Sequence, residues 1–243
     1  AQRLTHPATF EALGDGALPV APGEGVGGRR VALAHARREP VAVLVRLFTL
    51  GDPVEADLVD LALPTVTAAG VVRLGLGRFE GDAVVATADL RPYGDEDRTW
   101  WVVSDLPELA ARAPLSPDHV LGIGGASTTL AQWTPRAPVH RALDLGTGCG
   151  VQALHLSRHA TEIVATDISA RALDIAARNA ELNGLSWELR SGSLLGPVAG
   201  ERFDLIVSNP PFVITPRDRG LPTYEYRDGG AHDGEHRAQP VVA

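Results

Sequence analysis

The feature that most constrains the fold is a glycine-rich turn at residues 144–150, Asp-Leu-Gly-Thr-Gly-Cys-Gly, between an apolar run and a helix-like segment. Arg141–Leu145 has the character of a buried strand, and Val151–His159 has the pattern of a helix. The alternating glycines permit a tight turn and a close approach of the backbone to a ligand. A strand, a glycine turn and a helix in this order predict the first unit of an open α/β sheet.

The same alternation continues along the chain. Further strands are predicted at Ile163–Thr166, Trp187–Arg190 and Phe203–Ser208, with a helix at Ala170–Asn183. Strands that alternate with helices predict a parallel, doubly wound, Rossmann-like sheet with helices on both faces. We assign this domain to residues 139–243. Ligands of such sheets bind at the carboxyl ends of the strands.

The chain before residue 114 has a different pattern. Val41–Leu63 predicts two short amphipathic helices broken at residues 51–53 (Gly-Asp-Pro), and Pro64–Ala69 predicts a third that Gly70 closes. Short β-like runs follow at Val71–Leu76, Ala83–Ala88 and Trp100–Val103. Helices followed by a small hairpin predict a small α+β, winged-helix-like domain at residues 1–113. We expect it to recognise the substrate.

Residues 114–138 are predicted to be a linker and a segment close to the cofactor, with a helix at Thr128–Trp133.

Charge and composition narrow the class of partner. The chain has 30 acidic and 22 basic residues, a formal net charge of −8, which weighs against a nucleic-acid partner without excluding a local basic patch. It has no apolar run of the ~20 residues that a membrane span needs. A single cysteine and the lack of a signal-peptide pattern predict a cytoplasmic protein with no membrane partner.

The glycine turn distinguishes between two cofactor classes. A nicotinamide fingerprint, G-x-G-x-x-G/A, would need Gly or Ala where this chain has Val151. The turn resembles motif I of class I S-adenosylmethionine-dependent methyltransferases. This resemblance implies S-adenosylmethionine as the cofactor, with Asp144 near its sulfonium and amino group. The loop residues that would contact its methionyl part are Gly146, Thr147, Gly148 and Gly150.

The ends of the next two strands supply the other expected cofactor contacts. Asp167 follows the glycines by about 20 residues, the spacing of an acid that binds both ribose hydroxyls, and Ile168 is next to it. The alternative role of Asp167 is to cap the following helix, for which Ser169 competes. The family usually has an acid after its third strand to bind the adenine amino group. Here Ser193 takes that place, and the backbone near Leu194 is a second candidate contact.

A second motif, Asn209-Pro-Pro-Phe212, directly follows the last predicted strand. It resembles the (Asn/Asp)-Pro-Pro-(Tyr/Phe) signature of methyltransferases that modify planar NH2 groups. The Asn209 side-chain oxygen and the Pro210 carbonyl can accept the two N–H bonds of such a group, while Pro211 fixes the backbone. Phe212 can stack on the flat face of the acceptor. Asn209 is also expected to border the cofactor.

The methyl acceptor is less well determined. The continuation Val-Ile-Thr-Pro216 and the segment Tyr224–Gly230 resemble the release-factor glutamine methyltransferase group over residues 139–234. That resemblance implies a protein glutamine in a translation factor or ribosomal protein. Methyltransferases of adenine N6 or guanine N2 in ribosomal RNA share the four-residue signature, so an exocyclic base amine of RNA or DNA stays open. A nicotinamide oxidoreductase and a non-catalytic binding module with this fold are the competing classes.

Two features near the end of the chain qualify this interpretation. His232, Asp233, Glu235 and His236 lie in a glycine-rich segment with no other ligand signal, so we predict no metal site there. The family's sheet has three more strands than the residues after Asn209 supply. We therefore expect the methyltransferase domain to be incomplete in this chain.

Overall fold

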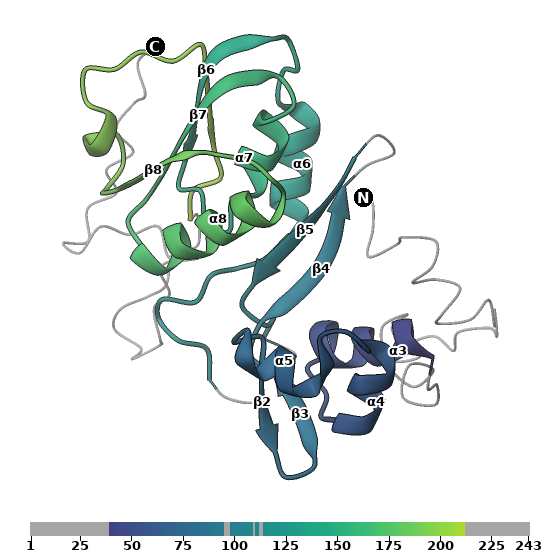
Figure 1. Cartoon of the computed structure of the whole chain (residues 1–243). Helices are drawn as coiled ribbons and strands as arrows, with labels where there is room; N and C mark the ends of the chain where they lie inside the picture. The colour runs from purple at the N-terminus through teal and green to yellow at the C-terminus, as the bar shows by residue number, and fades with distance from the viewer. Residues whose placement is uncertain (1–38, 95–97, 109, 112–113, 212–243) are drawn as a thin grey trace, which may run out of the picture. The chain divides into compact units, whose positions relative to one another are not determined.

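The computed structural model describes residues 39–94, 98–108, 110–111 and 114–211 (Figure 1). The chain divides into two compact units, residues 1–114 with 181–184, and residues 115–180 with 185–243. Within the described ranges, no helix is long and apolar enough to cross a membrane. Phe212, the segment Tyr224–Gly230 and the residues considered for a metal site lie outside the described residues.

In the first unit, helices precede two antiparallel hairpins (Figure 1). Its elements are α3 (Pro40–Leu44), the π-helix η1 (Val45–Thr49), β1 (Val54–Glu55), α4 (Ala56–Ala62), α5 (Thr67–Arg73), β2 (Gly77–Glu80), β3 (Ala83–Ala86), β4 (Asp89–Gly94) and β5 (Thr99–Ser104). The strands form one sheet of order β1-β3-β2 and a separate β4-β5 pair. Leu47, Val59 and Val84 are fully buried in the core that the helices share with β1 and β3.

The predicted break at Gly51 is confirmed, because Gly51 has a φ of 68° and separates η1 from β1. Gly70, in contrast, does not end the third helix but lies inside α5. The prediction of a strand at Val71–Leu76 was wrong, because Val71 and the next two residues continue α5. Val71 is buried against the core, so packing overrides the β-propensity of two adjacent valines. The strands β2 and β4 were not predicted.

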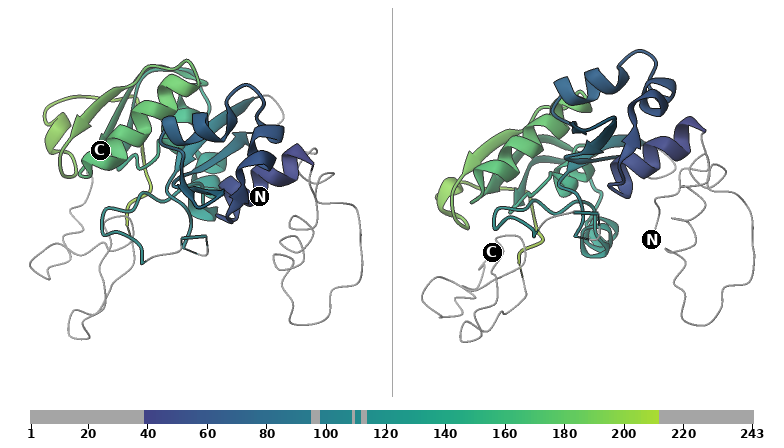
Figure 2. Two further views of the ribbon diagram at one scale, coloured as in Figure 1. Left: turned by 60° about the horizontal axis from the view of Figure 1, so that its bottom comes forward. Right: turned by 90° about the horizontal axis from the view of Figure 1, so that it is seen from below.

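The second unit contains the predicted parallel sheet, which confirms the α/β class (Figure 1). Its elements are α6 (Gly125–Trp133), β6 (Val139–Leu145), α7 (Val151–Leu156), β7 (Ala160–Asp167), α8 (Ala170–Leu182), β8 (Glu188–Ser191), the 3-10 helix η2 (Gly196–Val198) and β9 (Leu205–Ser208). The strand order is β8-β7-β6-β9, and every pair is parallel. Figure 2 shows α8, in green, beside this sheet from two further directions.

Successive residues of β6 face opposite sides of the sheet, as the pleat requires. Ala142 packs with residues of α6 and α7 on one side, whereas Leu143 packs with Val198 of η2 on the other. Parallel strands end at the same edge of a sheet. This arrangement therefore brings the segments that follow β6, β7, β8 and β9 together at one edge, where both sequence motifs lie.

Candidate functional site

The glycine turn is held to the neighbouring strand through its backbone. The N–H groups of Gly146 and Thr147 both donate to the carbonyl oxygen of Thr166, at 2.9 Å each. Gly146 and Gly148 have positive φ, and a Cβ at either position would meet no atom within 4 Å. A Cβ on Gly150 would instead lie 2.7 Å from Cζ3 of Trp187. The first two glycines therefore leave an open surface on the loop, whereas the third is needed for packing.

Asp144 lies beneath this loop and is fully buried. Its Oδ2 accepts hydrogen bonds from the Thr147 hydroxyl, at 2.7 Å, and from the Ala153 N–H, at 3.0 Å. Its Oδ1 is buried and has no hydrogen-bond partner in the described part of the chain. Burial raises the pKa of Asp144 from 3.8 to about 7, and the charge of Asp167 adds a smaller increase. Thr147 thus points inward, to Asp144, and not out of the loop.

Asp167 connects the glycine turn to the residues that precede α8. Its Oδ2 accepts the Gly148 N–H and its Oδ1 accepts the Ser169 N–H, both at 2.9 Å. Ser169 supplies the helix cap instead, since its hydroxyl accepts the Ala172 N–H at 3.4 Å. Each carboxylate oxygen of Asp167 can still accept a further hydrogen bond. The carboxylate is only half-buried, which leaves it accessible to a ligand.

The end of β8 lies beside the end of β7, because the Gly192 N–H donates to the Asp167 carbonyl at 3.0 Å. Ser193 and Leu194 follow and are exposed, and so is Ile168 after β7. Leu194 has a φ of 49°, in the left-handed region that residues with a side chain seldom adopt. An exposed leucine in this conformation offers apolar surface and backbone groups at the edge where ligands of such sheets bind.

Asn209 and Pro210 leave β9 next to the glycine turn. Leu145 pairs with Ser208 in the sheet, and the Ser208 hydroxyl also donates to the Leu145 carbonyl at 2.8 Å. The chain therefore enters the glycine turn and the Asn-Pro-Pro motif at the same level of adjacent strands. The Asn209 Nδ2 donates to the Ser127 Oγ at 3.3 Å. Pro210 and Pro211 are exposed.

Two residues of this site were missed by the sequence interpretation. Ser127 lies on α6, and its carbonyl oxygen accepts a 2.9 Å hydrogen bond from the side chain of Gln152 on α7. No motif or periodicity marks either residue, because the contact joins positions that are far apart in the sequence. The segment before residue 139 therefore contributes a side chain to the site.

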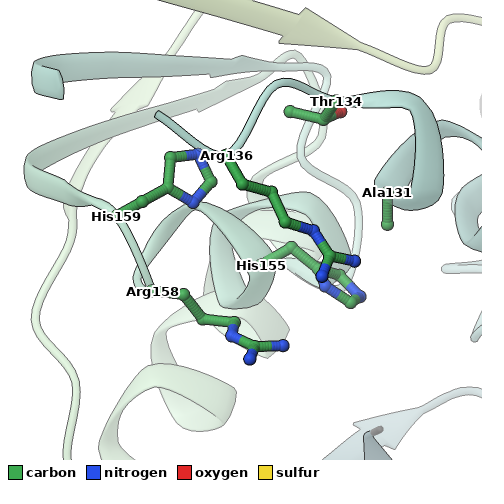
Figure 3. A pocket seen from close by; sticks show the side chains of 6 residues that line it. All are labelled: Ala131, Thr134, Arg136, His155, Arg158 and His159. Carbon is green, nitrogen blue, oxygen red and sulfur yellow. The ribbon is translucent and has the colours of Figure 1, made fainter. Parts of the chain in front are cut away.

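A pocket between α6 and α7 lies away from this site (Figure 3). It is lined by Ala131, Thr134, Arg136, His155, Arg158 and His159. Its lining includes the residues just before β6 and β7, so it opens at the amino ends of the strands. Burial lowers the pKa of His159, and the charges of Arg136 and Arg158 lower it further. None of the predicted site residues lines this pocket.

A comparison of the sequence with protein families finds matches in both units of the chain. Residues 122–219 match the methyltransferase small domain. Residues 20–87 match a domain of unknown function (DUF7059). The first match contains every residue predicted for the site, and the second falls in the first unit.

Several curated proteins are similar to part of this chain. The release factor glutamine methyltransferase of Xylella fastidiosa is 51% identical over 119 residues, which are 48% of this chain and 42% of that protein. The ribosomal protein uL3 glutamine methyltransferase of Bradyrhizobium diazoefficiens is 36% identical, over 53% of this chain and 37% of that protein. The ribosomal RNA small subunit methyltransferase C of Alcanivorax borkumensis is 36% identical, over 30% and 22%. The chain thus spans less than half the length of these relatives.

Proposed function

We propose that this chain is an S-adenosylmethionine-dependent N-methyltransferase that acts on the planar NH2 group of a protein glutamine. The observation that carries the proposal is the position of Asn209 and Pro210 beside the glycine turn, at the carboxyl ends of the paired strands β6 and β9. The relatives named for glutamine methylation support the reaction class, and the match to the methyltransferase small domain, over residues 122–219, covers both motifs.

The residues at this edge fit the cofactor. The open surface over Gly146 and Gly148 can admit a ligand against the backbone, and the half-buried Asp167 can accept hydrogen bonds from a ribose. Asp144 Oδ1 is a buried acceptor without a hydrogen-bond partner among the described residues, and its carboxylate would attract a positively charged group. Ser193 and Leu194 would border the adenine. When bound, S-adenosylmethionine supplies an activated methyl group.

The residues after β9 would orient the acceptor. An amide nitrogen is a weak nucleophile because its lone pair is delocalised. The Asn209 oxygen and the Pro210 carbonyl would accept its two N–H bonds, which holds the lone pair toward the cofactor side of the site. Phe212 would stack on the flat amide, and Pro211 would keep the turn rigid. No strong base is required, because the methylated nitrogen releases its proton to water.

The proposal extends to partners and to the first unit. A translation factor or ribosomal protein would be the acceptor in the reducing environment of the cytoplasm, which a single cysteine fits. Residues 1–113 would recognise that acceptor, and the described part of this range has helices followed by hairpins, the order of a winged-helix-like domain. Methylation of ribosomal RNA is the second candidate function. It is favoured by the similarity of this chain to the ribosomal RNA small subunit methyltransferase C. The net charge of −8 weighs against it.

Two measurements test the proposal. Calorimetry should show binding of S-adenosylmethionine and S-adenosylhomocysteine, and no binding of NAD. Transfer of a labelled methyl group should then be measured with a purified release factor, ribosomal protein uL3 and small-subunit ribosomal RNA as separate acceptors. Label on a glutamine supports the proposal, and label only on RNA replaces it with the second candidate. Cofactor binding without transfer to these acceptors or to a fractionated lysate would make the chain a binding module.

A further inference from the structure

Asn209 reaches a side chain that belongs to neither sequence motif. Its Nδ2 donates to the Oγ of Ser127, at 3.3 Å, on α6. Ser127 is itself held from the other side, because its carbonyl oxygen accepts the Nε2–H of Gln152 at 2.9 Å. Gln152 is 5% exposed and lies two residues after the last glycine of the turn. Ser127 therefore links the helix that follows the glycine turn to Asn209.

The Ser127 hydroxyl can accept from Nδ2 or donate to Oδ1, so a bound NH2 group that donates to Oδ1 leaves Nδ2 to pair with Ser127. An asparagine side chain has an acceptor oxygen and a donor NH2 group of nearly the same shape, and rotation by about 180° exchanges them. With Nδ2 donating to Ser127, the atom left for a ligand is Oδ1, which makes no hydrogen bond with the described residues. An NH2 acceptor needs that oxygen, because two NH2 groups facing each other cannot form a hydrogen bond through their donors.

We propose that Ser127 is a positioning residue that holds the Asn209 side chain beside the methyl acceptor, accepting from Nδ2 while Oδ1 accepts from the acceptor nitrogen, and that Gln152 holds Ser127 in place. The inference rests on the proposed function, since it assigns Asn209 to the acceptor nitrogen. Ser127 touches neither the acceptor nor the cofactor in this role. Its loss leaves Nδ2 without this partner, so the Asn209 side chain is no longer held in place while Oδ1 binds the acceptor.

The first test compares variants of α6 in the methyl-transfer assay. Ser127→Ala should lower kcat by about tenfold, the effect of one neutral hydrogen bond, and leave the affinity for S-adenosylhomocysteine within twofold. Ser127→Thr keeps the hydroxyl and should restore most of the rate. Thr129→Ala, an exposed threonine on the same helix, is the matched control and should behave as the parent chain. A Ser127→Ala protein with the parent kcat overturns the inference.

A measurement without turnover keeps the two proposals separate. The side-chain NH2 resonances of Asn209 can be assigned in a ¹⁵N spectrum by their absence in Asn209→Asp. They should shift in Ser127→Ala and keep their position in Thr129→Ala. No shift in Ser127→Ala overturns the Ser127 contact. If the resonances shift in Ser127→Ala but the parent protein methylates none of the acceptors, the proposed function is overturned and the contact stays established.

Discussion

Two acids near opposite ends of β6 have opposite environments. Asp144 lies at the carboxyl end of the strand and is buried, whereas Glu201 pairs with Arg141 near its start. Burial raises the pKa of Asp144 to about 7. Hydrogen bonds from Arg190, and then from Arg141, lower the pKa of Glu201. Arg141 contacts Glu201 at 2.6 Å, lies within 4 Å of two further glutamates, and stacks over Phe203 at 4.7 Å. Within the described residues, charge is compensated at Arg141 and left uncompensated at Asp144.

This difference supports the proposal that the carboxyl ends of the strands form the functional site. Paired charges and satisfied backbone groups stabilise the fold, as in the hydrogen bonds from the His140 and Arg141 N–H groups to Asp204 Oδ2, at 3.0 and 2.9 Å. A buried unpaired acid and a leucine at positive φ reduce stability, and such groups gather at ligand sites. We therefore expect changes at the carboxyl ends to alter ligand binding or transfer, and changes around Arg141 to leave both unaltered.

The largest expected effect is at Asn209. Asn209→Ala should lower methyl transfer by 10²–10³, about 2.7–4 kcal/mol, because it removes an oriented polar group that acts mainly in the transition state. The dissociation constant of S-adenosylmethionine should stay within about twofold, since the loop contacts are unchanged. Asn209→Asp should be milder, because a carboxylate accepts the same hydrogen bonds. Parent-like transfer by Asn209→Ala would remove this residue from the reaction, and lost cofactor binding would place it in the cofactor site.

The second effect is a change of stability with pH that depends on Asp144. The raised pKa means that the folded protein binds one more proton than the unfolded chain between about pH 4 and pH 7. Stability should fall as the pH rises through that window and stay lower above it. Asn cannot titrate, so Asp144→Asn should gain about 2–4 kcal/mol relative to the parent chain between pH 4 and pH 8.

Urea denaturation of both proteins at each pH measures this difference. The same change at Glu201, Glu201→Gln, should show the opposite trend at lower pH, because the lowered pKa of Glu201 stabilises the folded state as the pH rises toward the usual pKa of a glutamate, and this contribution is constant above it. A constant difference between Asp144→Asn and the parent across pH would mean that Asp144 is not buried as an unpaired acid.

The third effect concerns the cofactor contact that we propose for Asp167, and the carboxylate of Glu201 serves as the comparison. Asp167→Ala should weaken binding of S-adenosylmethionine by about 1–3 kcal/mol, because it removes charge-assisted hydrogen bonds. Glu201→Gln should leave the affinity within twofold in the same calorimetric titration. Equal losses for the two variants would contradict the distinction between the two regions.

The smallest effect is expected at Leu194. A side chain at positive φ costs about 1–2 kcal/mol, and glycine in its place costs about 0.5–1 kcal/mol in chain entropy, so Leu194→Gly should stabilise the protein slightly. Cofactor affinity should fall at the same time if Leu194 borders the adenine. Leu195→Gly, next to it, is the control: it has no positive φ to relieve and should not be stabilising. A more stable Leu194→Gly protein with unchanged affinity would remove Leu194 from the cofactor site.

The second unit could be predicted well because its elements are local patterns. The strands β6, β7 and β9 each contain a short apolar run, and amphipathic spacing marks α8. The first unit was predicted less well. Val71 and Val72 favour a strand by propensity but are held in α5 by burial against Leu47 and Val59, which are distant in sequence.

The sequence by itself determined the parallel sheet, the glycine turn and the Asn-Pro-Pro motif, because each depends on residues that are adjacent or regularly spaced. Only the tertiary structure decided what the individual polar atoms contact. Thr147 turns inward to Asp144, Asp167 spans the glycine turn and the start of α8, and Ser127 comes from another helix to meet Asn209. These contacts form when the strand ends meet at one edge of the sheet, and a hydrogen bond between side chains that are distant in sequence leaves no periodic pattern in the chain.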